Sequence, residues 1–184
     1  MGAEMKPTDT LKNEHKVILM VIDVAEKVAG KIADSKPADM EAIGKIVDFL
    51  KNFADRCHHA KEENLLFVKM EERGIMKEGG PIAVMLREHE IGRSHVRSIA
   101  DSLKKAKKGD TKAIHSIMEH LVAFAEVLRP HIMKEDRILY PMADHVMNEV
   151  DQEEMAEAFE AVEKEMGEGF HERYHNLAIE LSGK

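Results

Sequence analysis

The sequence has no tryptophan, one cysteine and five prolines among 184 residues, and aromatic residues make up only 4% of it. The single cysteine, Cys57, cannot close an internal disulfide, so nothing points to an oxidising compartment. No apolar run approaches the roughly 18 residues that a membrane-spanning helix needs. The first ten residues are polar and contain no apolar signal region. We therefore expect a cytoplasmic protein.

Positive charge is also in short supply. The chain carries 27 Lys and Arg against 35 Asp and Glu, which gives a formal net charge of −8. Such a surface is repelled by phosphate backbones and anionic headgroups, so we expect neither nucleic acid nor a membrane as partner. The one basic run, residues 104–108, is interpreted as a solvated helix end rather than a binding patch.

The residues that are abundant favour helix. Met, Ala, Leu, Lys and Glu lose little side-chain freedom in a helix, and apolar residues recur every three or four positions through long segments. Strand patterns are nearly absent. Short connections between long helices predict an all-α fold, an antiparallel up-and-down four-helix bundle. We expect this bundle over residues 1–145, with residues 146–184 forming a C-terminal helical extension of two shorter helices that packs on it.

Glycine, proline and capping residues predict where the four long helices begin and end. The first should stop at Gly30, and the second should begin with Pro37 in its first turn and end near residue 73. The third should begin at Pro81. The fourth, capped by Asp110, should end before Pro141. Residue 130, a proline inside the fourth helix, should kink it or open one backbone hydrogen bond.

The chain contains an internal duplication. Residues 56–67 and 129–140 share Arg, His, Lys and Glu in the same register, followed by acidic, aliphatic, Leu and aromatic positions. A Glu-His pair precedes each copy at nearly the same distance, ending at His15 in the first and at His89 in the second. The pattern predicts two copies of one helical hairpin, each carrying a His and then His-x-x-x-Glu.

The spacing within each copy places potential metal ligands on one helix face. Residues at i and i+4 are neighbours on a helix, so His58 and Glu62 point at one spot, as do His131 and Glu135. Pairing the hairpins about a pseudo-twofold axis would gather four imidazoles and two carboxylates in the middle of the bundle. Carboxylates can bridge two cations, and mixed nitrogen and oxygen ligation with open positions suits iron or manganese better than a closed zinc site.

A single His-x-x-x-Glu is weak evidence, because three other pairs share the spacing and such pairs are commonly surface ion pairs. His59 with Glu63 offers an alternative register, shifted by one residue. The repeat favours His58 and Glu62, which leaves His59 as a neighbour that supports a ligand. The alternative for the whole pattern is a duplicated bundle whose histidines are solvated.

These residues resemble the hemerythrin-like (HHE) cation-binding family over residues 8 to 145. The resemblance implies a four-helix bundle with a non-haem, carboxylate-bridged centre of two iron ions, with manganese or zinc as less favoured alternatives. The ligands that it implies are His15, His58, Glu62, His89, His131 and Glu135.

The chain departs from the family pattern in two places. Oxygen-carrying hemerythrins usually have a second histidine one turn after the third-helix ligand, and here Arg93 occupies that position. One ion should therefore keep an open position or take a ligand from elsewhere. In the C-terminal segment, His171 and His175 share a helix face, and they either supply that ligand or are solvated.

The resemblance leaves several functions open. We expect a protein that binds or senses dioxygen, nitric oxide or peroxide. The alternatives are an enzyme that removes peroxide or nitric oxide, an iron donor for iron–sulfur cluster repair, or a non-redox protein in which the metal only stabilises the bundle. Repair members usually carry an extra N-terminal segment with a cysteine, and none precedes the first helix here. The residues do not indicate a redox partner, and Tyr140 and Cys57 are predicted to be core residues.

Overall fold

The computed structural model describes residues 5–183, and every regular element in that range is helical. The expectation of an all-α fold is confirmed. Residues 1–4 of the polar N-terminal segment lie outside the described residues. The elements are α1 Pro7–Ala33, α2 Met40–Phe49, η1 Leu50–His59, η2 Glu62–Leu66, α3 Phe67–Glu72, α4 Pro81–Ala106, α5 Thr111–Lys134, η3 Glu135–Leu139, α6 Tyr140–Val146, α7 Glu149–Met166 and α8 Phe170–Ser182.

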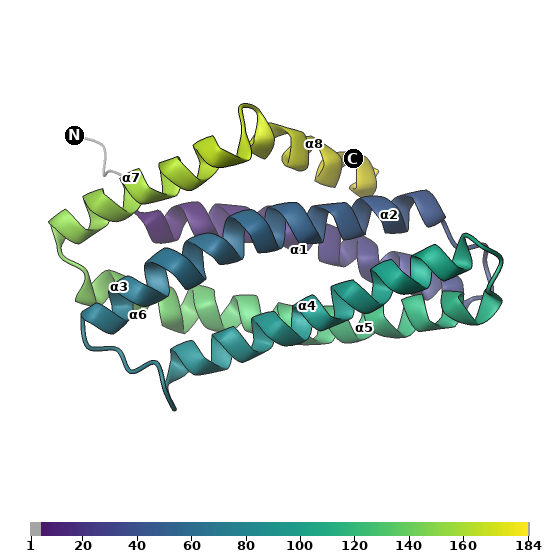
Figure 1. Cartoon of the computed structure of the whole chain (residues 1–184), viewed down its shortest axis with the longest axis horizontal. Helices are drawn as coiled ribbons and strands as arrows, with labels where there is room; N and C mark the ends of the chain where they lie inside the picture. The colour runs from purple at the N-terminus through teal and green to yellow at the C-terminus, as the bar shows by residue number, and fades with distance from the viewer. Residues whose placement is uncertain (1–4, 184) are drawn as a thin grey trace.

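Four long helical segments lie side by side along the long axis of the molecule (Figure 1). They are α1, the continuous run from α2 through η1 and η2 to α3, α4, and the run from α5 through η3 to α6. The C-terminal helices α7 and α8 cover one side of this group, where α8 contacts α1 and α2 and α7 contacts α1, η1 and η2. No helix within residues 5–183 combines the length and the apolar character needed to cross a membrane.

Two predicted helix boundaries were wrong at the connection between the first and the second helical segments. Helix α1 continues through Gly30 for three more residues, because one glycine costs a helix only about 1 kcal/mol. Pro37 lies in the following loop, after Ser35, which takes a positive φ of 59°. The cap of the second segment is Asp39, whose carboxylate accepts the backbone N–H groups two and three residues further on.

The fourth segment was also predicted too short. It passes through Pro141 and ends at Val146. The predicted start of the third segment at Pro81 and that of the fourth segment after Asp110 are confirmed. The turn before the proline is π-helical, and the N–H of Tyr140 bonds to the carbonyl of the residue five before it. Proline has no N–H to contribute, and the wider turn gives its ring room that a regular α-helical turn would not.

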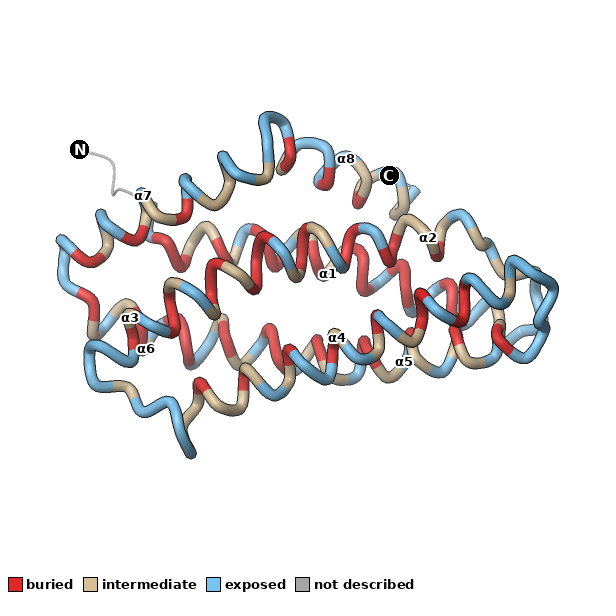
Figure 2. Tube along the Cα trace, in the orientation of Figure 1, coloured by how far each residue is buried: buried red, intermediate tan, exposed pale blue. Residues whose placement is uncertain are grey.

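Two apolar layers enclose the middle of the molecule, and buried residues line the inner sides of the segments (Figure 2). In every long segment a buried polar stretch lies between them. On α1, for example, Leu11 belongs to one layer, Ile18 to the other, and His15 lies between. Burying an aliphatic or aromatic side chain stabilises by about 1.5–3 kcal/mol, so the layers offset the cost of holding charged groups between them.

Candidate metal centre

The four histidines that the duplication predicts converge inside the molecule. His15 on α1, His58 on η1, His89 on α4 and His131 on α5 are each at most 1% exposed. The rings of His15 and His58 have centroids 4.6 Å apart, and so do those of His89 and His131. The histidines therefore form two pairs, and each pair takes one residue from each of the two helical segments of one hairpin.

Two fully buried carboxylates lie between these pairs. The two oxygens of Glu135 face different histidines, with Oε2 3.3 Å from Nε2 of His15 and Oε1 3.1 Å from Nε2 of His131. Oε2 of Glu62 lies 3.5 Å from Nε2 of His58 and 3.5 Å from Nε2 of His89. Each carboxylate thus meets imidazoles from both pairs, which is the placement that bridging two cations requires.

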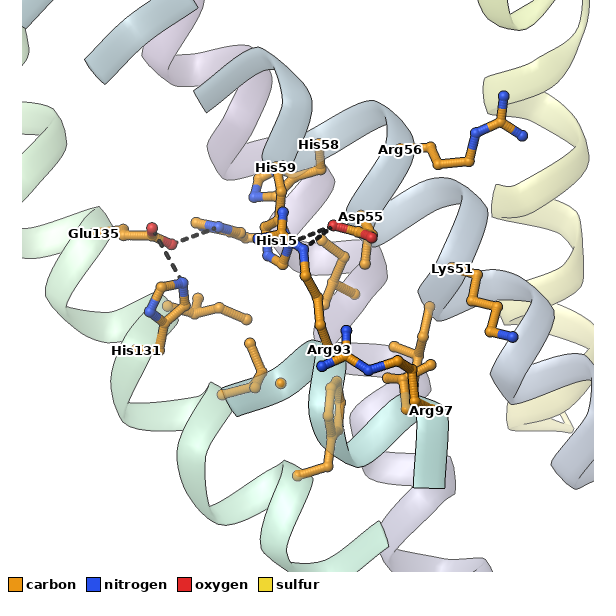
Figure 3. A pocket seen from close by; sticks show the side chains of 18 residues that line it. His15, Lys51, Asp55, Arg56, His58, His59, Arg93, Arg97, His131 and Glu135 are labelled. Carbon is orange, nitrogen blue, oxygen red and sulfur yellow. Dashed lines mark hydrogen bonds and ion pairs between the residues drawn. The ribbon is translucent and has the colours of Figure 1, made fainter. Parts of the chain in front are cut away.

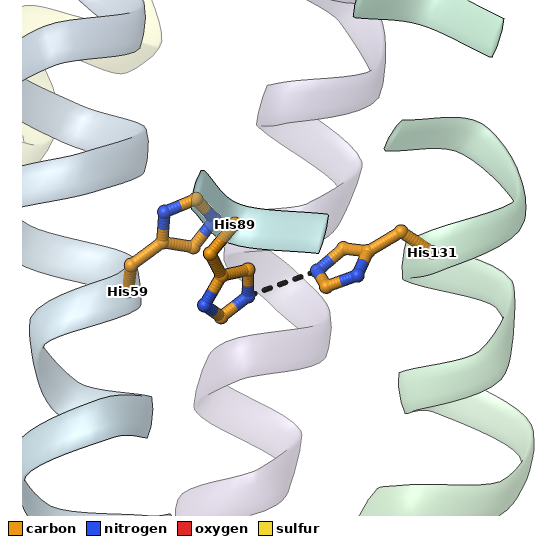
Figure 4. A group of neighbouring side chains, drawn as sticks. All are labelled: His59, His89 and His131. Carbon is orange, nitrogen blue, oxygen red and sulfur yellow. Dashed lines mark hydrogen bonds between the residues drawn. The ribbon is translucent and has the colours of Figure 1, made fainter. Parts of the chain in front are cut away.

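A fifth histidine joins the site. The ring of His59 stacks on that of His89 with centroids 3.8 Å apart, and Nε2 of His89 lies 3.0 Å from Nε2 of His131 (Figure 4). Two groups of potential ligands result, and within each the ligand atoms all lie within 4.8 Å of one another. One group is His59, His89 and His131, and the other is His15, His58, Glu62 and Glu135.

From the sequence, His59 was predicted only to support a neighbouring ligand and not to bind metal itself. In a regular helix consecutive side chains diverge by roughly 100°, so His58 and His59 would not share a face. Segment η1 is π-helical, and its wider turn narrows that angle and lets both rings point inward. The signal that could have found His59 was the His-His doublet combined with the arginine at position 93.

Arg93 occupies its position by making ion pairs. Its guanidinium donates to Asp55 over 2.7 Å and to Glu63 over 2.8 Å. Glu63 in turn lies 2.6 Å from Nδ1 of His89. Arg93 therefore steadies a carboxylate that orients one of the clustered histidines.

The four repeat-related histidines share one arrangement at the edge of the site. In each, Nδ1 lies within hydrogen-bond distance of a carboxylate, which sets the tautomer and turns Nε2 toward the centre. These carboxylates belong to Asp136 for His15 (2.8 Å), Glu14 for His58 (2.9 Å), Glu63 for His89 (2.6 Å) and Glu88 for His131 (2.9 Å). The pseudo-twofold relation of the two hairpins thus extends to the residues behind the histidines.

Tyr140 is fully buried, as predicted, but it also makes polar contact with the site. Its hydroxyl donates a 2.6 Å hydrogen bond to Oε1 of Glu62 and lies 3.3 Å from Nε2 of His15. Burial and then the charge of Glu62 raise the pKa of Tyr140 well above its usual value. The phenol therefore stays protonated and acts as a donor.

In the absence of a bound cation, two histidines of the centre are protonated. Burial opposes charge on His15, but the hydrogen bond to Asp136 and the charge of the nearby Glu135 outweigh it and raise its pKa to about 10. Burial likewise opposes charge on His89, but the nearby carboxylate of Glu135 and the hydrogen bond to Glu63 raise its pKa to about 10. The two buried imidazoles of His15 and His89 thus carry positive charge, which the surrounding carboxylates stabilise.

The remaining groups respond to these charges. Burial and then the neighbouring His15 and His89 hold the pKa values of His58 and His59, respectively, well below the usual value. Burial and then the charge of Glu135 raise the pKa of Glu62 to about 8. Burial acts to raise the pKa of Glu135 too, but the clustered imidazoles outweigh it and hold that pKa well below its usual value.

Several buried atoms of the centre have no hydrogen-bond partner among the described residues: Oε2 of Glu62, both carboxylate oxygens of Glu135 and Nδ1 of His59. Leaving buried carboxylate oxygens unpaired is costly, and bound cations remove that cost. The donor set of imidazoles and carboxylates fits iron or manganese chemistry. The residues present therefore fit the metal pair that the duplication implies.

A cavity of about 340 Å³ reaches the centre from the surface. Its inner end includes His15, His58, His59, His131 and Glu135 (Figure 3). Its walls are mainly apolar, formed by Ile18, Leu50, Val96, Phe124, Leu128 and Ile132. Basic side chains line it as well: Lys51, Arg56, Arg93 and Arg97. Small molecules can therefore reach the histidines through an apolar passage.

The two C-terminal histidines do not reach the centre. His171 on α8 lies against Glu14 and Cys57, and His175 lines a surface pocket one turn further along the helix. The structure therefore does not bring them to the centre, and the additional imidazole beside His89 is that of His59.

The sequence model of the hemerythrin HHE cation binding domain matches residues 6–143, most of the chain. The chain therefore belongs to this family. It is also similar to three curated proteins, Mb2018 of Mycobacterium bovis and MT2051 and Rv1995 of Mycobacterium tuberculosis, each described as uncharacterized. Each is 23% identical over 152 residues, which cover 83% of this chain but only 59% of the relative. No solved structure matches the chain significantly.

Proposed function

We propose that the protein binds two iron ions at this centre, within the antiparallel up-and-down bundle of hemerythrins. His15 and His58 would hold one ion, and His59, His89 and His131 would hold the other. Glu62 and Glu135 would bridge them. The observation that carries the assignment is Glu135, whose two oxygens face histidines of both pairs and have no hydrogen-bond partner among the described residues.

The donor set favours iron over zinc. Structural zinc sites usually have four ligands and often thiolates, whereas this centre offers five imidazoles and two carboxylates for two ions. Such a count leaves open positions after both carboxylates bridge. Manganese is the alternative that shares these preferences.

We propose further that the protein binds or senses dioxygen, or a related small molecule such as nitric oxide or peroxide. Ferrous ions held in this way supply electrons and open coordination positions to such ligands. The cavity delivers the ligand, and its aliphatic walls (Ile18, Leu128 and their neighbours) limit the water that accompanies it. The carboxylates behind the histidines keep each Nε2 aimed at the ions while the charge of the centre changes.

A second candidate is an enzyme that acts on peroxide, and Tyr140 favours it. Its buried hydroxyl donates to Glu62 and lies beside His15, so a proton is available within the centre. A carrier has no need of such a donor, whereas peroxide turnover requires protons. The same placement also serves a sensor, in which the hydrogen bond would only steady Glu62.

Rapid mixing of the reduced, iron-loaded protein with dioxygen separates these functions. A long-lived new absorption spectrum that reverses on removal of oxygen would support binding or sensing. Immediate conversion to the oxidised form would exclude carriage, and steady peroxide consumption that Tyr140→Phe reduces would support the enzyme. Failure to retain about two iron ions per chain after anaerobic loading would defeat the proposal itself.

A further inference from the structure

A second cluster of metal-ligating side chains lies behind the histidine centre, on the side covered by α7 and α8. It comprises Cys57, Glu14 and His171, whose ligand atoms all lie within 4.8 Å of one another. Glu163 on α7 lies beside it, with Oε1 3.5 Å from Nε2 of His171. Cys57 is fully buried and Glu14 nearly so, while His171 reaches the surface.

The spacing of these atoms is that of ligands around one ion. Nε2 of His171 lies 3.5 Å from Sγ of Cys57, 3.5 Å from Oε1 of Glu14 and 3.5 Å from Oε1 of Glu163. Zinc bonds of about 2.0 to 2.3 Å in a tetrahedron place neighbouring ligand atoms about 3.3 to 3.8 Å apart. The imidazole of His171 therefore already stands at ligand-to-ligand distances from the other three side chains.

The second hairpin provides an internal comparison. There Glu88 contacts both His131 and Lys134, just as Glu14 contacts both His58 and Lys61. The Glu-Lys-His arrangement is thus complete in the second hairpin without a thiol, a further imidazole or a further carboxylate. In the position equivalent to Cys57 the second hairpin has a proline.

The second hairpin orients His131 without counterparts of Cys57, Glu163 and His171. These three side chains are therefore not needed to orient His58. Glu163 and His171 come from α7 and α8, which lie beyond the residues matched by the family. The cluster exists only because the C-terminal segment folds back over the first hairpin (Figure 1).

Charge and access both allow a divalent cation. The ammonium of Lys61 donates to Oε1 of Glu14 and Oε1 of Glu163, the same oxygens that face His171, and neutralises one of these two carboxylates. With a thiolate formed at Cys57, the remaining two negative charges match one divalent ion. A surface pocket of about 500 Å³, lined by Glu14, Glu163, His171 and His175, connects the cluster with solvent.

We propose that this cluster is a second metal site, which binds one thiophilic divalent cation of the zinc class through Cys57, His171 and Glu14, with Glu163 as the fourth ligand. Binding replaces the thiol proton of Cys57, which passes to solvent, by a metal–sulfur bond. Glu14 then contacts the ion through one oxygen and His58 through the other, so the site adjoins the histidine centre without sharing its imidazoles.

Cobalt(II) is the probe of choice because Cys57 is the only cysteine in the chain. A sulfur-to-cobalt charge-transfer band can therefore arise from this site alone. Iron-loaded protein titrated with cobalt(II) should develop this band with a stoichiometry of one per chain, and zinc(II) should abolish it by displacement. Cys57→Ser should lack the band, and His171→Ala should need at least tenfold more cobalt(II) to form it.

His175→Ala is the matched control, since it removes an imidazole from the same helix and pocket but from outside the cluster. It should titrate like the unaltered protein. The proposal is overturned if no charge-transfer band forms, or if His171→Ala and His175→Ala titrate alike. His131→Ala, which disturbs only the histidine centre, should keep the band, so this test stands or falls independently of the di-iron proposal.

Discussion

The imidazole of His59 lies stacked on that of His89, with 3.8 Å between the ring centroids and 20° between the ring planes. Two stacked imidazole rings repel each other when both are protonated. Burial and then the charge of His89 accordingly hold the pKa of His59 well below its usual value. The neutral ring of His59 is thus ready to act as a ligand.

We predict that His59→Ala lowers the iron content to about one ion per chain. It removes one of three imidazoles on one side of the centre and leaves His15 and His58 in place. Iron per chain, measured by elemental analysis after anaerobic loading, tests this. His115→Ala is the control, because His115 is exposed and pairs only with Glu119. Two retained ions in His59→Ala would remove His59 from the ligand set.

His58→Ala and Glu135→Ala should each lower the iron content to one ion or none. The first removes an imidazole and the second removes a carboxylate that faces both pairs of histidines. Glu135→Ala should have the larger effect, because a bridging group serves both ions. The same elemental analysis, with circular dichroism to show that the helices persist, provides the measurement. Full retention in either variant would contradict the proposed ligands.

Glu88→Gln should weaken metal affinity by roughly 10 to 100-fold, the usual cost of losing a partner behind a ligating histidine. Glu88 lies 2.9 Å from Nδ1 of His131 and also pairs with Lys134. Competition with a chelator gives the affinity. Asp101→Asn, an exposed change on the same helix at a residue that pairs with Lys104, should leave affinity unchanged. Equal affinities for the two variants would show that Glu88 does not orient the histidine.

The metal-free protein should lose stability as pH rises from about 6.5 to about 10. The pKa values of His15 and His89 are about 10 in the folded chain against 6.5 when unfolded, so their stabilising contribution is complete below 6.5 and lost as pH rises through 10. Glu62, with a pKa of about 8, acts in the same direction. Each pKa unit corresponds to about 1.4 kcal/mol, so urea unfolding at several pH values will resolve the trend.

Below pH 6.5 the trend should reverse, because His58 and His59 are held neutral in the folded chain and take up protons on unfolding. The metal-loaded protein should instead gain stability from pH 6 to pH 8, since metal ions compete with protons for imidazoles. Parallel pH profiles for the metal-free and loaded forms would contradict the assignment of the charged histidines to the metal centre.

The sequence predicted the helices and most of the centre because both depend on local spacing. The duplicated His-x-x-x-Glu and the preceding Glu-His fixed His15, His58, Glu62, His89, His131 and Glu135 as a candidate set, and the structure brings all six together. The duplication thus carried long-range information that a single motif would not have provided.

The features that escaped prediction depend on departures from regular helix geometry and on distant contacts. The inward turn of His59 requires the π-helical segment η1, and the passage of the chain through Pro141 requires η3. Neither π-helical segment can be inferred from the regular 3.6-residue period of apolar residues. The position of His171 depends on how α8 folds back against α1, a contact between residues more than a hundred positions apart.

The helices α7 and α8 pack mainly against the first of the two related hairpins (Figure 1). As a result, the side chain of Glu14 is 5% exposed, whereas that of its counterpart Glu88 is 16% exposed. Two cations held at the two ends of the centre would then experience different local dielectrics, in addition to their different numbers of imidazoles. If the proposed iron pair is bound, one ion should be easier to oxidise than the other, and a half-oxidised protein would keep its ferrous ion at a preferred position.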